Sequence, residues 1–132
     1  MTKNRNAILF CCCSLLCFMA MGCAPAPPTP DVEAKAIIKA ALDSWSLGGS
    51  DSKFVETHKN VERFFDIDWL SKKVLLRYEI KGVQKSELSH GGYDVIVVLV
   101  FQSKAGTEIT EQRRYHAFQD NISEDRWDIN AN

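Results

Sequence analysis

The sequence predicts one α+β domain, in which a long N-terminal helix packs on a curved antiparallel sheet of four or five strands. Apolar residues repeat at helical spacing at residues 31–47, near the start of the domain. From residue 74 onward the pattern changes to the two-residue period that is typical of strands. About 100 residues follow the last proline, which is enough for one modest core and too few for two.

Residues 1–22 are predicted to be a lipoprotein signal peptide. Lys3 and Arg5 precede an apolar run at residues 7–21, which is shorter than the roughly 20 residues that a membrane-spanning helix needs. Residues 20–23, Ala-Met-Gly-Cys, resemble a bacterial lipobox. This resemblance implies that the leader is removed and that Cys23 carries the lipid. A plain secretory signal cut near Ala24 or Ala26, or a short retained anchor, is the alternative.

The cysteines and prolines are confined to the N-terminal region. All five cysteines lie within the first 23 residues, and all four prolines lie at residues 25–30. Residues 31–132 therefore contain no disulfide framework, no cysteine-ligated metal site and no cysteine nucleophile. The proline-rich residues 23–30 predict a lipidated cysteine followed by an extended spacer, with the single domain at residues 31–132.

The charge of the chain excludes nucleic acid as a partner, and its predicted location indicates which partners to expect. The predicted lipid anchor places the domain in the cell envelope, attached to a membrane and facing the periplasm or the exterior. Without the leader the chain has 14 basic and 17 acidic residues, a net charge of −3, which is the wrong sign for binding nucleic acid. We expect the membrane, through the lipid on Cys23, and an envelope protein or small ligand as partners.

The predicted helix at residues 31–47 begins after Pro30 and ends at Gly48 and Gly49. Its apolar face consists of six residues at three- and four-residue spacing: Ala34, Ile37, Ile38, Ala41, Leu42 and Trp45. Ser50 is expected to cap a second, shorter helix that extends to about residue 59. Residues 64–69 are a further candidate edge strand.

Strands are predicted at residues 74–81, 93–102, 107–118 and 126–129. The first of these alternates apolar and polar residues, so one of its faces is expected to be buried. Residues 93–102 are apolar on both faces and rich in β-branched residues, which predicts a central strand covered on both sides. An open edge strand would also allow a homodimer.

This arrangement resembles the nuclear-transport-factor-2-like and cystatin-like group. The resemblance rests on the helix, residues 45–48, the strands at 74–81 and 93–102, the turn at Gly106 and residues 126–129. The details also resemble uncharacterised bacterial lipoproteins, in which a stretch like residues 66–69 precedes a strand like residues 75–80. The group includes enzymes, adaptors and inhibitors, so the fold alone implies no activity.

The weak catalytic candidates are Asp66 and Asp68. If residues 64–69 form a strand, the two carboxylates lie on one side of it and could share a proton or hold a hard cation. The alternative is a solvated edge beside Trp69, because two carboxylates alone make a poor metal site. We expect no metal and no cofactor.

The three histidines, His58, His90 and His116, show no spacing that is typical of a zinc site and are predicted to be scattered on the surface. On the strand at residues 107–118, Arg113 and Tyr115 share one face. Together with Tyr78 they are the candidate polar groups of a small-molecule pocket inside a cup-shaped sheet. The alternative is that Arg113 forms ion pairs on an open sheet face.

Two classes of function follow. The first is a non-enzymatic module that binds a protein or small ligand, and the second is a small-molecule enzyme with an Asp or His general base. A spacer without a ligand is a third alternative. A closed pocket with a converging carboxylate or imidazole would favour the enzyme, whereas a filled interior and an exposed apolar patch would favour binding.

Overall fold

A computed structural model describes residues 22–119 and 125–132. Three helices and five strands occur in the order α1 (Pro30–Ser46), α2 (Asp51–Thr57), β1 (Val61–Phe65), α3 (Ile67–Leu70), β2 (Leu75–Lys85), β3 (Tyr93–Gln102), β4 (Glu108–Gln119) and β5 (Trp127–Ala131). Apart from Gly22, the predicted signal peptide lies outside the described residues. Within the described residues, none of the helices has the length and apolar character to cross a membrane.

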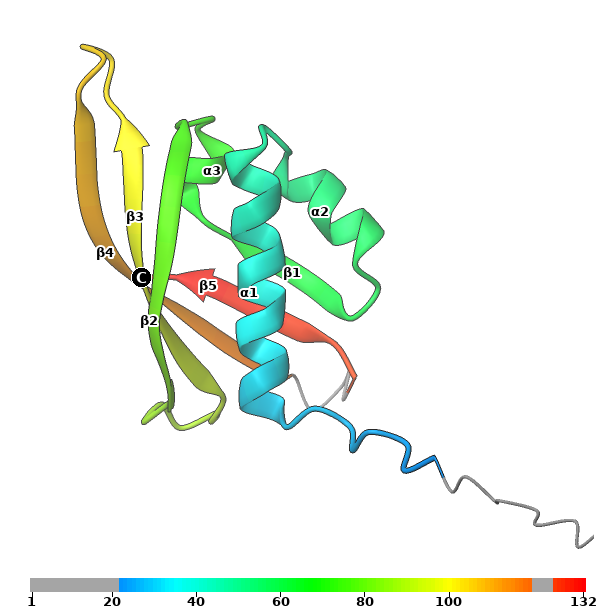
Figure 1. The fold of residues 1–132 in the computed structure, drawn as a ribbon. Helices are drawn as coiled ribbons and strands as arrows, with labels where there is room; N and C mark the ends of the chain where they lie inside the picture. Colours follow the sequence, from blue (N-terminus) through cyan, green and yellow to red (C-terminus); the bar gives the residue numbers. More distant parts are fainter. Residues whose placement is uncertain (1–21, 120–124) are drawn as a thin grey trace, which may run out of the picture.

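The five strands form one mixed sheet in the order β1-β5-β4-β3-β2, which confirms the α+β class (Figure 1). The prediction of a wholly antiparallel sheet is wrong, because β1 pairs with β5 in parallel. The remaining neighbours are antiparallel, and β3 and β4 pair without interruption from Tyr93 opposite Ala117 to Gln102 opposite Glu108. The chain passes from β1 at one edge of the sheet through α3 to β2 at the other edge, and the antiparallel strands β2 to β5 then lead back to β1.

The prediction for residues 93–102 is correct in its bounds and wrong about the covering of both faces. These residues form β3, an interior strand between β4 and β2. Val95, Val97 and Leu99 are fully buried against the helices, whereas Ile96 and Val98 on the other face are only half-buried. All three described helices lie on one side of the sheet (Figure 1). The second apolar face of β3 is therefore covered mainly by neighbouring side chains of the sheet.

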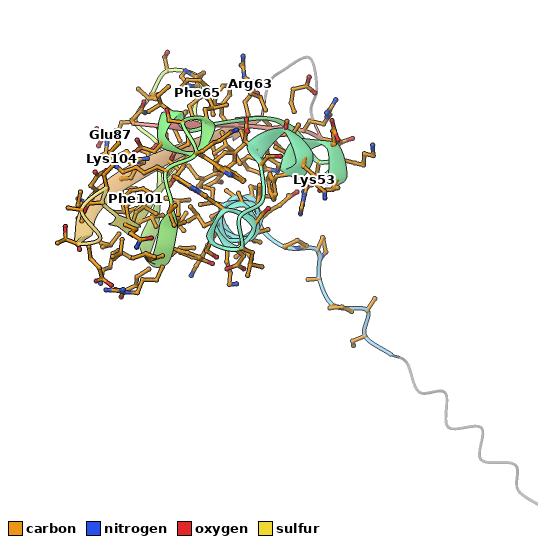
Figure 2. All side chains as sticks on the ribbon, turned by 90° about the horizontal axis from the view of Figure 1, so that it is seen from above. Lys53, Arg63, Phe65, Glu87, Phe101 and Lys104 are labelled. Atoms are coloured by element: carbon orange, nitrogen blue, oxygen red, sulfur yellow. The ribbon has the colours of Figure 1, made fainter. Side chains whose placement is uncertain are left out.

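The core lies between α1 and the sheet. All six apolar residues of the helical repeat are buried there: Ala34, Ile37, Ile38, Ala41, Leu42 and Trp45. Phe101 of β3 points into this space and contacts the ring of Trp45, with a centroid distance of 5.4 Å (Figure 2). Aromatic rings from α2, β1 and α3 extend the core: Phe54, Phe64 and Trp69. The interior of the curved sheet is filled by side chains.

The expectation of a strand at residues 64–69 is wrong. β1 ends at Phe65, and residues 67–70 form the short helix α3. The chain changes from strand to helix at Asp66, which has an extended backbone. The side chain of Asp66 accepts a hydrogen bond from the backbone N–H of Asp68. Aspartate is one of the preferred residues at the N-terminal cap of a helix for this reason. Asp66 and Asp68 are therefore not neighbours on one side of a strand.

Candidate functional site

Asp66 lies at the junction of β1 and α3 and is the centre of a buried network of charged side chains. Its own side chain is completely buried. Arg113, on the helix-facing side of β4, donates from one nitrogen to both carboxylate oxygens of Asp66, at 2.8 and 2.9 Å. The hydroxyl of Tyr115 donates to the Oδ2 atom of Asp66 at 2.7 Å. Strand β4 and the start of α3 are thus held together by a buried ion pair.

Asp68, Glu111 and Lys73 form the outer part of the network. The other terminal nitrogen of Arg113 donates to Asp68 and, at 2.8 Å, to Glu111. Lys73 donates to Glu111 at 3.0 Å and to Asp68 at 3.4 Å. We call these six residues the Arg113 network: Asp66, Asp68, Lys73, Glu111, Arg113 and Tyr115. Three carboxylates face two cations, so the network carries a formal charge of −1.

The surroundings shift the pKa values of the network in a consistent way. Burial by itself would raise the pKa of Asp68, but the hydrogen bond and charge of Arg113, with Lys73, outweigh burial and lower it. Burial and the negative charge of Asp66 raise the pKa of the Tyr115 hydroxyl well above its ordinary value. Burial opposes the charge of Arg113, yet its bonds to Asp68 and Asp66 raise its pKa. These shifts favour the charged forms of Asp68 and Arg113 and the protonated hydroxyl of Tyr115.

The chemical capacity of Asp66 is limited by its partners. Its Oδ1 atom accepts from Arg113 and from the N–H of Asp68, and its Oδ2 atom accepts from Arg113 and Tyr115. A carboxylate with about four acceptor sites is then fully occupied. The arrangement suits a structural brace and is poorly suited to a general base, which needs a free lone pair directed at its substrate.

Tyr78 does not join Arg113 and Tyr115. It lies on β2, and its hydroxyl donates to the carboxylate of Asp43 and to the backbone oxygen of Lys39, the latter at 3.3 Å. Burial and the nearby Asp43 raise the pKa of this hydroxyl. The structure therefore gathers Asp66, Asp68, Arg113 and Tyr115 at one place and ties Tyr78 to α1.

A groove lies beside the network at the C-terminal end of α1. Its wall contains two tryptophans, Trp45 and Trp69, whose rings stack at 5.6 Å with an interplanar angle of 8°. Trp69 donates from its ring N–H to the backbone oxygen of Gly49 at 2.7 Å, and Trp45 donates to that of Lys73 at 2.8 Å. These bonds fix both rings, so the wall of the groove is rigid.

We call this hollow, of about 370 Å³, the α1–α3 groove. It is lined by Trp45, Ser46, Gly48, Gly49, Ser50, Asp51, Trp69, Leu70, Lys72, Lys73, Val74 and Leu75. Leu70 and Val74 remain substantially exposed, at 42% and 52%. An exposed apolar rim at a fixed hollow is typical of a binding surface.

A second, wider hollow of about 610 Å³ adjoins the groove and shares Lys72, Lys73 and Val74 with it. Asp68 of the Arg113 network and Lys104 of the β3–β4 turn also line this hollow. Neither Lys72 nor Lys104 forms an ion pair with another of the described residues. Two cations that pair with no acid in residues 22–119 and 125–132 therefore lie next to an apolar groove.

The prediction that the histidines are scattered on the surface is wrong for His116, which is buried, whereas His90 is exposed but is paired with it. His116 of β4 is buried, and its Nε2 atom lies 2.9 Å from that of His90 in the β2–β3 connection. The Nδ1 atom of His116 lies 2.8 Å from the carboxylate of the buried Asp94. His58 is separate, at the end of α2, with its Nδ1 atom 2.8 Å from the backbone oxygen of Phe54.

Sequence reasoning missed the α1–α3 groove and the His90–His116 pair. A signal for the pair was available, since Asp94 and His116 occupy facing strands, but the register of those strands was needed to align them. In the described residues, no three side chains of His, Cys, Asp or Glu are gathered so that they could together hold a metal ion. The chain matches no protein-family model, no curated protein and no solved structure.

Proposed function

We propose that the protein is a lipid-anchored module of the cell envelope that binds a protein or small ligand in the α1–α3 groove and does not transform it. The observation that carries this proposal is the apolar rim of the groove, where Leu70 and Val74 are exposed beside the fixed rings of Trp45 and Trp69. The curved sheet under a single long helix supports the nuclear-transport-factor-2-like and cystatin-like group as its fold family.

The position of the groove suits presentation to a partner. Residues 23–29 lead into the N-terminal end of α1 (Figure 1). The residues that line the groove include Trp45 and Ser46, at the C-terminal end of the same helix. Seventeen helical residues at about 1.5 Å each separate the two ends by roughly 25 Å. If Cys23 carries the anchor, the groove points away from the membrane that holds it.

The polar groups beside the groove favour binding over catalysis. The carboxylate of Asp66 is buried and fully occupied, so it has no lone pair free for a substrate. Asp68 reaches the wider hollow, but its pKa is lowered, and a carboxylate that holds its proton weakly is a weak base near neutral pH. An enzyme with Asp66 or Asp68 as its base is therefore the less supported alternative.

The charges at the rim indicate the chemistry of the ligand. Lys72 and Lys104 have no acidic partner among the described residues, and Lys72 lines both hollows. An apolar segment in the groove with a carboxylate or another anion beside it would pair with these lysines. We therefore assign the ligand to this chemical class, either as a segment of an envelope protein or as a small amphipathic anion.

Site-specific photocrosslinking tests the proposal in cells that express the full chain. A benzoylphenylalanine at position 70 should yield a discrete adduct, visible by intact mass or on a gel. The matched control is the same residue at position 88, because Leu88 is similarly exposed, at 50%, in the β2–β3 connection. The adduct from position 70 should weaken when Lys72 is replaced by Glu.

Two results would contradict binding at the α1–α3 groove. One is the same adduct from positions 70 and 88, which would indicate nonspecific contact. The other is an adduct from position 88 alone, which would place the binding surface at the other end of β2.

The edges of the sheet support a homodimer as a second part of the proposal. Strands β1 and β2 are the two edge strands, and Leu76 of β2 is exposed at 40%. Backbone groups along an edge strand are available to pair with a second copy. Sedimentation of the full chain in detergent should then give a dimer, and Leu76→Lys should shift it to a monomer.

A further inference from the structure

The face of the sheet away from the helices contains a second cluster of titratable groups, which the α1–α3 groove does not involve. Its centre is the pair of imidazoles of His90 and His116, whose Nε2 atoms are 2.9 Å apart. The ring planes are nearly perpendicular, with an angle of 81°. Two ring nitrogens at this separation form an N–H···N hydrogen bond when one of them carries hydrogen, and they can bind one metal ion when both present lone pairs.

The orientation of the His116 ring is fixed by Asp94, on the side of the ring opposite His90. Its side chain is 4% exposed, and its Nδ1 atom lies 2.8 Å from Oδ1 of Asp94 on the neighbouring strand β3. Asp94 is itself held, since its other oxygen lies 3.9 Å from the guanidinium of Arg114. When the Nδ1–H of His116 donates to this carboxylate, the lone pair of the neutral ring lies on Nε2 and is directed at His90. Metal-binding histidines commonly donate their other ring N–H to a carboxylate in this way.

His90 is brought to His116 by a tightly packed connection. Backbone bonds close the loop, from Ser86 to Gly92 and from Gly91 to Leu88, both at 2.9 Å. Gly92 has φ +94, and a Cβ atom there would lie 2.4 Å from the backbone oxygen of Ala117. Only glycine allows the loop to approach β4 this closely. The ring of His90 also contacts that of Phe118, at 4.7 Å.

The imidazole pair is open to solvent on one side. A shallow hollow of about 430 Å³ is lined by both histidines and by Phe65, Leu88, Phe118, Asn130, Ala131 and Asn132. Water can therefore reach a metal ion held by the two Nε2 atoms and complete its coordination. Asn130 lies opposite His116 in the register of β4 and β5, so its amide oxygen is a candidate further ligand.

We propose that His90 and His116 form a two-imidazole site for a divalent transition metal ion, with Asp94 as the residue that orients His116. Imidazole nitrogen favours the later first-row metals. With metal–nitrogen distances of about 2.0–2.1 Å, Nε2 atoms 2.9 Å apart subtend an angle of about 90° at the metal. That angle matches neighbouring positions of a tetragonal Ni²⁺ or Cu²⁺ site, whereas a tetrahedral Zn²⁺ site needs a separation of about 3.3 Å.

Ni²⁺ is the probe for the test, because it does not oxidise the cysteines of the chain. Calorimetric titration of the full chain in detergent should show one more equivalent of bound Ni²⁺ for the wild type than for His90→Ala. His90 is an exposed loop residue, so this variant should fold normally. The matched control is His58→Ala, which removes the imidazole outside the cluster and should keep the wild-type stoichiometry.

Asp94→Asn separates a metal site from an ordinary imidazole hydrogen bond. This variant should keep the stoichiometry and bind Ni²⁺ about 10–100-fold more weakly, because the carboxylate that orients the His116 ring is lost. Equal Ni²⁺ binding by the wild type and His90→Ala would overturn the proposal and leave an N–H···N hydrogen bond between the two rings. Loss of binding in His58→Ala but not in His90→Ala would overturn it as well.

Discussion

The guanidinium of Arg113 holds both oxygens of the fully buried Asp66 carboxylate, at 2.8 and 2.9 Å, across 47 residues of sequence. A buried charge is tolerated only when it is paired and hydrogen-bonded. The Arg113–Asp66 pair therefore joins the start of α3 to β4, and with it one wall of the α1–α3 groove to the centre of the sheet.

Arg113→Met should strongly destabilise the domain, because it leaves Asp66 buried without its cation. Loss of one member of a buried ion pair costs about 3–5 kcal/mol. Urea unfolding followed by tryptophan fluorescence measures the change in the free energy of unfolding. The matched control is Arg77→Met, whose partner Glu108 is exposed, and this variant should change little. Equal effects of the two substitutions would show that the Arg113–Asp66 pair contributes no more to the free energy of unfolding than the exposed Arg77–Glu108 pair.

Asp68→Asn should make the free energy of unfolding depend less steeply on pH in the acidic range. The pKa of Asp68 is lowered in the folded protein, so below the ordinary aspartate value of about 3.9 the unfolded chain takes up a proton first. This contribution to stability is present above about pH 4 and is lost as the pH falls through the folded pKa. The measurement is the free energy of unfolding between about pH 2 and 6.

The acid effect of Asp68→Asn should depend on Arg113, because Arg113 is the main group that lowers the pKa of Asp68. In an Arg113→Met background, adding Asp68→Asn should change the acid limb less than it does in the wild type. An unchanged effect in that background would mean that Arg113 is not the cause.

Trp45→Ala should cost about 3–5 kcal/mol, because this ring is buried, stacks on Trp69 and contacts Phe101. Trp45→Phe keeps much of the apolar contact but loses the hydrogen bond to the backbone oxygen of Lys73, so it should fall between the wild type and Trp45→Ala. Thermal and urea unfolding give the comparison. A near-neutral Trp45→Ala would contradict the packing of α1 on the sheet.

Cys23→Ala should move the protein from the membrane fraction to the soluble fraction. Cys23 is exposed in the segment that precedes α1, where a lipid on its sulfur would not disturb the domain. Cell fractionation and immunoblotting measure the change, and Ser52→Ala serves as a substitution outside the anchor region. Retention of Cys23→Ala in the membrane fraction would argue against lipidation at this residue.

The elements with a strong local period could be predicted from the sequence. The β-branched residues of β3 mark its bounds, and the three- and four-residue repeat identifies the apolar face of α1. The pairing of β1 could not be predicted, because its five residues alternate only weakly. Its partner β5 is also distant in sequence: Arg63 pairs with Asp128, 65 residues later.

The site required long-range information as well. The alternation of the strand places Arg113 and Tyr115 on one face, and Asp66 is a candidate catalytic carboxylate in the sequence. No local pattern indicates that these three residues meet. A local signal for α3 was present, since Asp66 is a good helix cap before Ile67. The proximity of His90 and His116 depends on the register of β3 with β4 and on Gly92.

The parallel pairing of β1 with β5 also bears on the order in which the domain assembles. β1 is the first strand in the chain, yet it has no neighbouring strand until residues 127–131 join the sheet. Closing so long a stretch of chain is entropically slow, and contacts between distant residues delay folding. Until β5 has paired, α1, α2 and β1 therefore form an incomplete unit, and Phe64, whose ring contacts Tyr115 of β4 in the folded domain, lacks part of its packing.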